Sequence, residues 1–232
     1  MNTNEPQSCD ISAKGSSCCS STPATEGVDL KQHWNNAYTN SLEEKLGWFE
    51  TDLSPTLKLI EKSGITSSAR IINIGAGSTT LVDELLALKY SNIIATDLSE
   101  VALNNLENQI GKNKVQLIVD DLTNPQGLKT IDPVDLWIDR AVLHFFTEAK
   151  DQDRYFELLK SKIAKRGYVL LAEYNLDGAK KCAGLPVNGY SLEMLQSKLG
   201  SEFRLIESFD FTYTMPSGNE RPYVYTLFKR LE

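Results

Sequence analysis

The residue types that could do chemistry in this chain follow apolar runs, at the points where buried strands would end. In chain order they are Gly75-Ala76-Gly77 after "ARIINI", Asp97 after "SNIIAT", Asp120 and Asp121 after "VQLIV", and Asp139 after "VDLWI". Glycines let the backbone approach a ligand closely, and an acid roughly 20 residues further on can accept both hydroxyls of a ribose. A carboxylate after the third run can accept from an adenine amine. A rim of carboxylates would repel a pyrophosphate and attract a cationic ligand.

Strands and helices must alternate to bring these residues together. Beyond residue 65 we expect strands at 69–75, 91–97, 115–121, 134–139 and 168–174, with helices at 79–90, 100–110, 153–164 and 191–199. Ser99 can cap the helix that follows it. This alternation predicts an α/β fold with a parallel sheet, right-handed connections and helices on both faces. Residues 203–215 and 223–231 read as two strands joined by a turn, so the last strand should be antiparallel. In such a sheet the ligand lies beyond the carboxyl ends of the strands.

Composition divides the chain into three parts and restricts its function. Residues 1–28 are rich in Ser, Thr, Gly and Pro and should form a flexible tail. Residues 29–64 regain apolar and aromatic side chains, and we expect a helical lid there, with residues 65–232 as the core. A net charge of −7 argues against nucleic-acid or membrane partners. With no apolar run of about 20 residues and no leader-like start, the predicted location is the cytoplasm.

Four segments resemble the motifs of class I S-adenosylmethionine-dependent methyltransferases. They are "IINIGAGS", "ATDLS", "VDDLT" and "DLWIDRAVLHFF", and the terminal hairpin resembles that family's reversed seventh strand. The resemblance covers about residues 30–230 and implies a Rossmann-like three-layer sandwich with a seven-stranded, mostly parallel sheet and an antiparallel last strand. A closer resemblance is to small bacterial methyltransferases with "HW…Y…WF", "DRAVxHF" and "KCAGLPVNGYS" segments. Their layout is similar to that of thiopurine and citrate-synthase-lysine methyltransferases.

The cofactor predicted from pattern and resemblance together is S-adenosyl-L-methionine. We expect it to contact Trp34, Tyr38, Asn73, Gly75, Ala76, Gly77, Asp97, Leu98, Asp121, Leu122 and Asp139. Two positions depart from the family, since Asn73 replaces the usual acid and Thr79 the third glycine. A dinucleotide-binding oxidoreductase is the alternative, but Thr80 stands where its fingerprint needs a small residue. A cofactor-binding protein without turnover is a further alternative.

Three residues are catalytic candidates. His144, in "DRAVLHFF", could deprotonate an acceptor or could simply pack beneath the next helix. Asp139 should lie near the reactive end of the ligand, where it could meet the methionine ammonium. Arg140 could pair with Asp139 or hold an anionic acceptor, pairing within the fold being the favoured interpretation. In the lid, Trp34 and Tyr38 could place aromatic faces beside a sulfonium, whereas Trp48 should be structural.

The acceptor is predicted only by class. An Asn/Asp-Pro-Pro-aromatic turn, typical of base methylation, is missing after the fourth strand, so a small molecule is favoured and a protein lysine comes second. No C-x-x-C pair or His-rich helix indicates a metal site. Cys9, Cys18 and Cys19 could capture a soft ion or metalloid, although a tail without such a role is the favoured reading. Cys182 is expected to be a small packing residue near the pocket rim.

Overall fold

The computed structural model describes residues 27–78 and 80–232, and its centre is a seven-stranded sheet. The strands are β1 (Arg70–Ile74), β2 (Asn92–Asp97), β3 (Gln116–Val119), β4 (Val134–Arg140), β5 (Ile163–Tyr174), β8 (Phe203–Thr214) and β9 (Glu220–Arg230). Their order is β3-β2-β1-β4-β5-β9-β8. The pairs from β3 to β5 are parallel, whereas β9 is antiparallel to both β5 and β8. The predicted mostly parallel sheet with a reversed last strand is confirmed.

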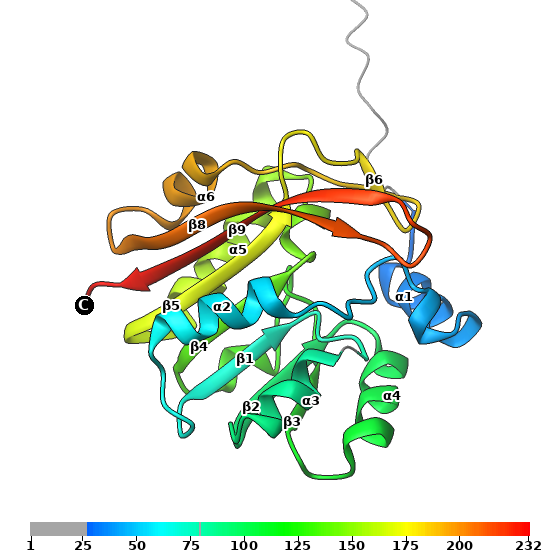
Figure 1. Ribbon diagram of the computed structural model, residues 1–232, viewed down its shortest axis with the longest axis horizontal. Helices are drawn as coiled ribbons and strands as arrows, with labels where there is room; N and C mark the ends of the chain where they lie inside the picture. Colours follow the sequence, from blue (N-terminus) through cyan, green and yellow to red (C-terminus); the bar gives the residue numbers. More distant parts are fainter. Residues whose placement is uncertain (1–26, 79) are drawn as a thin grey trace, which may run out of the picture.

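Helices cover both faces of this sheet, as Figure 1 shows. On one face lie α2 (Ser54–Ser63), α3 (Thr80–Ala87) and α4 (Glu100–Ile110), and on the other lie α5 (Ala149–Lys162) and α6 (Leu192–Leu199). Successive side chains of a strand point to opposite faces. In β1, Ile71 therefore packs with Leu59 and Leu85, whereas Ile72 packs with Tyr155. The three-layer sandwich follows from this alternation.

The remaining elements gather at the carboxyl ends of the parallel strands. They are α1 (Leu30–Asn40), the short 3-10 helices η1 (Glu43–Lys45) and η3 (Leu143–Phe145), and a small hairpin of β6 (Lys181–Cys182) and β7 (Leu185–Pro186). A further 3-10 helix, η2 (Leu128–Thr130), lies in the connection from β3 to β4. In Figure 1, α1 lies beyond the strand ends, on the side to which β1 points. The ligand site predicted for that edge must lie beneath it.

Helix starts follow local capping rules. The side chains of Asp29, Ser99 and Ser191 accept hydrogen bonds from backbone amides in the first turns of α1, α4 and α6. The predicted cap at Ser99 is therefore confirmed. At the other end of α2, Gly64 takes a left-handed conformation with φ +68°, which glycine adopts without strain.

Two elements differ from the expected pattern. The strand expected at 168–174 begins at Ile163, directly after α5, because the chain pairs with β4 before and after a bulge. Within residues 29–64, α1 and the segment with Trp48 and Glu50 face the pocket. The second helix, α2, buries Leu59 and Ile60 against the sheet, so it is a layer of the sandwich rather than part of a lid.

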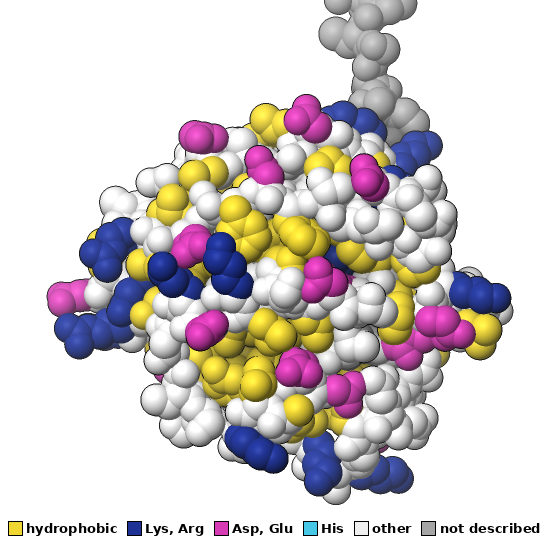
Figure 2. Space-filling model, viewed as in Figure 1, with side chains coloured by type: hydrophobic (Ala, Val, Ile, Leu, Met, Phe, Trp, Pro, Cys, Tyr) yellow, Lys and Arg dark blue, Asp and Glu magenta, His cyan; other side chains and the backbone are white. Residues whose placement is uncertain are grey.

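Figure 2 shows the face that carries α2 and β8. Hydrophobic side chains show in a central band there, with basic and acidic side chains interspersed around them. On β8, the ring of Phe209 stacks on Tyr225 at 5.5 Å, and the ammonium of Lys58 lies 4.2 Å from the centre of the Phe209 ring. The band is thus partly the outer edge of the core, covered by lysine stems.

Candidate cofactor and acceptor site

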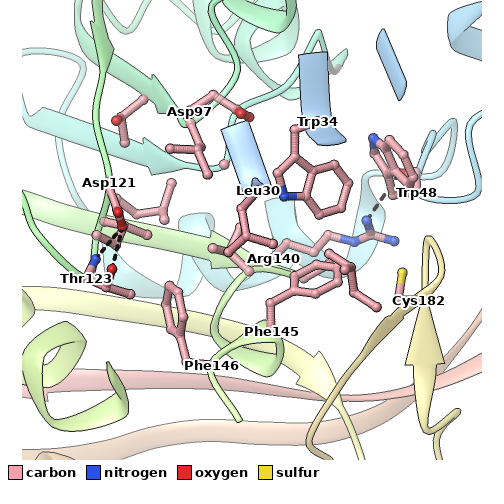
Figure 3. Close-up of a pocket in the computed structure, with 18 of the residues that line it drawn as sticks. Leu30, Trp34, Trp48, Asp97, Asp121, Thr123, Arg140, Phe145, Phe146 and Cys182 are labelled. Atoms are coloured by element: carbon pink, nitrogen blue, oxygen red, sulfur yellow. Dashed lines mark hydrogen bonds between the residues drawn. The ribbon is translucent and has the colours of Figure 1, made fainter. Parts of the chain in front are cut away.

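A cavity of about 230 Å³ opens at the carboxyl ends of β1 to β4. Nine of the predicted site residues line it: Trp34, Tyr38, Asn73, Gly75, Asp97, Leu98, Asp121, Leu122 and Arg140. Figure 3 shows Asp97 and Asp121 on one side of this pocket and Arg140, Trp48 and Cys182 on the other, with Leu30 and Trp34 between them. The pocket therefore has an acidic end and an end that carries a cation and a thiol.

The glycine turn shapes the pocket floor through its backbone. Gly75 has φ +56°, and a Cβ built on it would lie 2.1 Å from Cγ2 of Val142. Gly77 also has a positive φ, and its amide donates to Oδ2 of Asp97 at 2.9 Å. Ala76 donates from its amide to the Thr96 carbonyl and is buried. Ala76 and Gly77 thus hold the turn against β2 and do not form the pocket wall.

The contact at Gly75 leads to a first prediction. We expect Gly75→Ala to lower the free energy of unfolding by about 2 kcal/mol or more, because a left-handed alanine costs about 1–2 kcal/mol and the new methyl group overlaps Val142. Thermal or urea unfolding measures the loss. Adding Val142→Ala removes the overlapping methyl group and should restore the part of the loss that comes from crowding. Equal stability of Gly75→Ala and the parent chain would contradict the close approach.

Asp97 sits at the end of β2 with both carboxylate oxygens already in use. Oδ2 accepts from the amide of Gly77, and Oδ1 accepts from the amide of Ser99 at 2.8 Å. Burial raises the pKa of Asp97 to about 6, although these backbone amides act in the opposite direction. Each oxygen keeps a second lone pair, so the carboxylate can still accept from a diol in the pocket.

The two acids after β3 have different environments. The carboxylate of Asp120 accepts from the amides of Asp121, Gln126 and Leu128, so it organises the loop. Asp121 uses Oδ1 for the amide and hydroxyl of Thr123, at 2.8 and 2.7 Å, and no described residue occupies its Oδ2. Figure 3 shows this pair at the acidic end of the pocket. Of the two, Asp121 is the acid with an oxygen available for an amine.

Arg140 pairs with Glu50 and not with its neighbour Asp139, which corrects that sequence-based expectation. Its Nε lies 3.0 Å from Oε1 of Glu50 and also donates to the Tyr225 hydroxyl, and Nη1 donates to the carbonyl of Trp48. Only 11% of the Arg140 side chain and 5% of the Glu50 side chain are exposed. Burial raises the pKa of Glu50, and Arg140 partly offsets this. Nη2 of Arg140 is buried and has no hydrogen-bond partner among the described residues.

Asp139 and His144 are fully buried and do not line the pocket. Asp139 accepts from the Tyr155 hydroxyl at 2.6 Å and from the Val142 amide at 3.1 Å. Nδ1 of His144 lies 2.9 Å from Oε2 of Glu173. Burial, together with the charge of Glu173, raises the pKa of Asp139 well above its usual range. The structure thus leaves Asp139 and His144 out of the pocket wall, and the buried His144 matches the alternative interpretation of a histidine packed within the core.

Aromatic side chains enclose the rest of the pocket. Trp34, from α1, contacts the edges of Trp48 and Phe145 at ring distances of 5.4 and 5.1 Å. The indole of Trp48 donates to the Tyr38 hydroxyl at 3.0 Å, and the pocket wall includes Trp48 itself. Trp48, expected to be only structural, and Phe145, within the quoted "DRAVLHFF", were not predicted as site residues. Their aromatic character was the only available signal.

Some predictions fall outside the described residues. They concern Cys9, Cys18 and Cys19, the flexible tail up to residue 26, and the missing third glycine at Thr79. In the part of the chain that is described, no helix combines the length and apolar character that crossing a bilayer requires.

Comparison with known proteins places this geometry in context. Residues 72–171 match the methyltransferase domain family. EEF1A lysine methyltransferase 2 of Danio rerio is 24% identical over 170 residues, which cover 66% of this chain and 71% of the relative. A SAM-dependent methyltransferase from Anabaena variabilis superposes with a TM-score of 0.70 at 14% identity, covering 87% of this chain and 93% of that one. The N-methyltransferase NodS from Bradyrhizobium japonicum, solved with S-adenosyl-L-homocysteine, superposes with a TM-score of 0.69 at 12% identity. The match covers 88% of this chain and 100% of that one. The fold is that of S-adenosylmethionine-dependent methyltransferases.

Proposed function

We propose that this chain transfers a methyl group from S-adenosyl-L-methionine to a small-molecule acceptor. The observation that carries the proposal is the distribution of charge in the pocket. Asp97 and Asp121 lie at one end, and Arg140, the only lysine or arginine of the described wall, lies at the other, paired with Glu50. The wall also includes the acids Asp120, Glu148 and Asp151. An adenosine needs hydrogen-bond acceptors for its hydroxyls and amine, and a methionine tail needs a cation for its carboxylate. The pocket offers acceptors at one end, in Asp97 and Asp121, and a cation at the other, in Arg140.

The residues would hold the cofactor as follows. Asp97 would accept from the ribose hydroxyls and Asp121 from the adenine amine, with Leu98 and Leu122 beside the base. Arg140, which lines the pocket, would supply the positive charge for the methionine carboxylate. The ammonium would face the β1 end, where Asn73 and the carbonyls of the glycine turn lie. Because the Asp139 carboxylate already accepts from the Tyr155 hydroxyl and the Val142 amide, it would not contact the cofactor. It would only help to shape the site.

Methyl transfer from a sulfonium mainly requires that the acceptor is aligned with the methyl group. The acceptor must lie about 3 Å from the methyl carbon, in line with the breaking carbon–sulfur bond and away from water. Trp34, Trp48 and Phe145 supply a desolvated, aromatic compartment between the acidic end and Cys182. Aromatic faces also stabilise a sulfonium more than the neutral thioether that remains after transfer.

Two observations favour different acceptors. The pocket is lined by Trp34, Trp48, Phe145 and Phe146 beneath α1, which suits a small planar molecule. The relatives that act on a lysine of EEF1A favour a protein side chain as the second candidate. A lysine would have to enter the aromatic part of the pocket as a narrow alkyl chain. The closer resemblance to a small bacterial group, and the predicted cytoplasmic location without nucleic-acid partners, remain predictions.

Calorimetric titration tests the cofactor. We expect S-adenosyl-L-homocysteine and S-adenosyl-L-methionine to bind with micromolar dissociation constants and NAD not to bind. Binding of NAD alone would favour the oxidoreductase alternative. Binding of the first two without formation of S-adenosyl-L-homocysteine, across a panel of small aromatic amines, thiols and lysine peptides, would favour a cofactor-binding protein without turnover.

The raised pKa of Asp97 predicts a pH-dependent affinity. The ribose hydroxyls donate to the carboxylate, so only the ionised form binds well. With a pKa of about 6 in the free protein, affinity for S-adenosyl-L-homocysteine should be constant above pH 7 and about tenfold weaker at pH 5. Stability should change in the opposite sense, because a raised acid pKa favours the folded state below pH 4, and this contribution is lost as pH rises through 6. Asp97→Asn is the control, since its affinity should show no step near pH 6.

The aromatic lid makes a separate prediction that depends on the charge of the ligand. Trp34→Ala should weaken S-adenosyl-L-methionine binding by about 5- to 30-fold, corresponding to about 1–2 kcal/mol of cation–π energy, and weaken S-adenosyl-L-homocysteine less. Tyr38→Ala should also weaken binding of S-adenosyl-L-methionine, but by less. Part of this effect should act through Trp48, whose indole donates a hydrogen bond to the Tyr38 hydroxyl. Trp34→Phe keeps a ring and serves as the control. Unchanged affinity in both alanine variants would rule out the lid.

A further inference from the structure

The two edge strands of the sheet differ in length and in protection. β3, at one edge, has four residues, whereas β8, at the other, has twelve (Figure 1). An unpaired edge offers its backbone amides and carbonyls to any other strand, and proteins protect such edges with short strands, lysine, proline or bulges. In β8 a bulge between Leu205 and Glu207 interrupts the first part of the strand. From Ser208 to Thr214 this edge has no lysine, no proline and no bulge.

The register of the β8–β9 hairpin shows which backbone groups of β8 point outward. The Met215 amide donates to the Asn219 carbonyl at 2.8 Å, so this pair is hydrogen-bonded across the hairpin. Hydrogen-bonded and non-hydrogen-bonded pairs alternate along an antiparallel ladder. The residues whose amides and carbonyls point away from β9 are therefore Ser208, Asp210, Thr212 and Thr214. No described strand or turn pairs with these outward residues on that side.

The side chains of this segment divide between the two faces of the sheet. Phe209 and Phe211 lie on the face of α2, where both are partly buried, and their ring centres lie 5.5 and 5.8 Å from that of Tyr225. Asp210 and Thr212 lie on the opposite face and are exposed. Asp210 also lines a groove of about 360 Å³ beside the start of α6. The segment is thus open along its edge and on one face.

A second copy of the same strand fits this edge when the two copies run antiparallel about a two-fold axis at Phe211. That register pairs Asp210 with Thr212, and Ser208 with Thr214, of the other copy. Each of these pairs exchanges two backbone hydrogen bonds, so every outward residue is used. Phe211 meets its own copy at the axis, in a non-hydrogen-bonded pair, where side chains come closest. The strand is therefore complementary to itself.

Neighbouring registers conflict with the sequence. An axis at Asp210 would place two carboxylates directly opposite each other, which is destabilising. An axis at Thr212 would bring Ser208 opposite Pro216, which has no amide hydrogen to donate. With the axis at Phe211, a threonine hydroxyl faces the Asp210 carboxylate and no like charges meet.

We propose that β8 is a homodimer interface, in which two copies of this chain join their sheets edge to edge through residues 208–214 about a two-fold axis at Phe211. The interface is isologous, so two copies close it and no open edge of β8 remains for a third. It lies beyond β9, on the side of the sheet away from the strands β1 to β4 that bound the pocket. The proposal therefore stands independently of methyl transfer.

Sedimentation equilibrium of the full chain is the first test. We expect the mass of two copies at about 100 µM and a shift towards the mass of one copy on dilution, because a small interface of this kind gives a dissociation constant of about 1–10 µM. The mass of one copy at the higher concentration, or of more than two, overturns the proposal.

Thr212→Pro tests the backbone pairing. The Thr212 amide points away from β9, so proline is tolerated there in a single copy but cannot donate to the second. The dissociation constant of the dimer should rise at least about tenfold, because the axis repeats the loss in both copies. Thr212→Val keeps the amide and should dimerise like the parent chain. A folded Thr212→Pro chain with the parent dissociation constant overturns the proposal.

Charge exchange at Phe211 tests the position of the axis. Phe211→Lys and Phe211→Glu each place like charges opposite each other and should be monomeric. An equal mixture of the two variants should form a mixed dimer, because opposite charges then meet at the axis. Folded single variants that dimerise, or a mixture that stays monomeric, overturn this register. Thr212→Pro decides the proposal if the Phe211 variants fail to fold.

Discussion

Replacing Asp97 with alanine is expected to weaken S-adenosyl-L-homocysteine binding at least a hundredfold. Hydrogen bonds to a charged group contribute about 1.5–3 kcal/mol each, and two ribose hydroxyls would lose theirs together, which is about 3 kcal/mol or more. Isothermal titration calorimetry at pH 7.5 gives the affinity directly. A loss of less than fivefold would contradict the assignment of the ribose to the end of β2.

The same substitution also removes an acceptor from the protein itself. The amides of Gly77 and Ser99 both donate to Asp97, so Asp97→Ala should lower stability by about 1–2 kcal/mol as well. Thermal unfolding must therefore accompany the titration, to show that the variant is folded at the temperature of measurement. Asp153→Asn serves as the control, because it removes the same charge from an exposed acid on α5 that pairs with Lys198. It should leave both the affinity for S-adenosyl-L-homocysteine and the free energy of unfolding unchanged.

The largest stability effect is expected at Arg140. Arg140→Met should lower the free energy of unfolding by about 3–5 kcal/mol, because it leaves the buried carboxylate of Glu50 without its partner. Tyr213 and Tyr223 also lose the guanidinium that lies 4.7 and 5.0 Å from their ring centres. Urea unfolding at pH 7 measures the loss, which should shrink as pH falls and Glu50 takes up a proton.

A double-mutant cycle separates the structural role of Arg140 from binding. Glu50→Gln combined with Arg140→Met removes both charges and should recover most of the lost stability. Affinity for S-adenosyl-L-homocysteine should stay low in the double variant if Arg140 holds the methionine carboxylate. Stability and affinity recovering together would show that Arg140 acts on the ligand only through the fold. A stable Arg140→Met single variant would contradict the ion pair.

The sequence by itself determined the sheet, its reversed last strand and the acidic end of the pocket. Glycine residues and acids that directly follow buried strands need no long-range information, because all parallel strands of one sheet end at the same edge. Gly75, Asp97 and Asp121 could therefore be assigned to one site from the positions of three apolar runs. Of the two acids after β3, the Asp120 carboxylate is taken up by loop amides, and Asp121 remains the proposed acceptor for the adenine amine.

Only the tertiary structure decided what happens after β4. Asp139 and Arg140 are neighbours in sequence, but successive side chains of a strand point to opposite faces, so Asp139 meets Tyr155 beneath α5 and Arg140 meets Tyr225 and Glu50 on the other face. Glu50 comes from a segment before β1 and carries no local signal of this pairing. The stacking of His144 on Tyr174 likewise depends on the meeting of η3 and β5, which α5 separates in the chain. Local pattern fixes where a strand ends, and packing between distant elements fixes which side chains meet there.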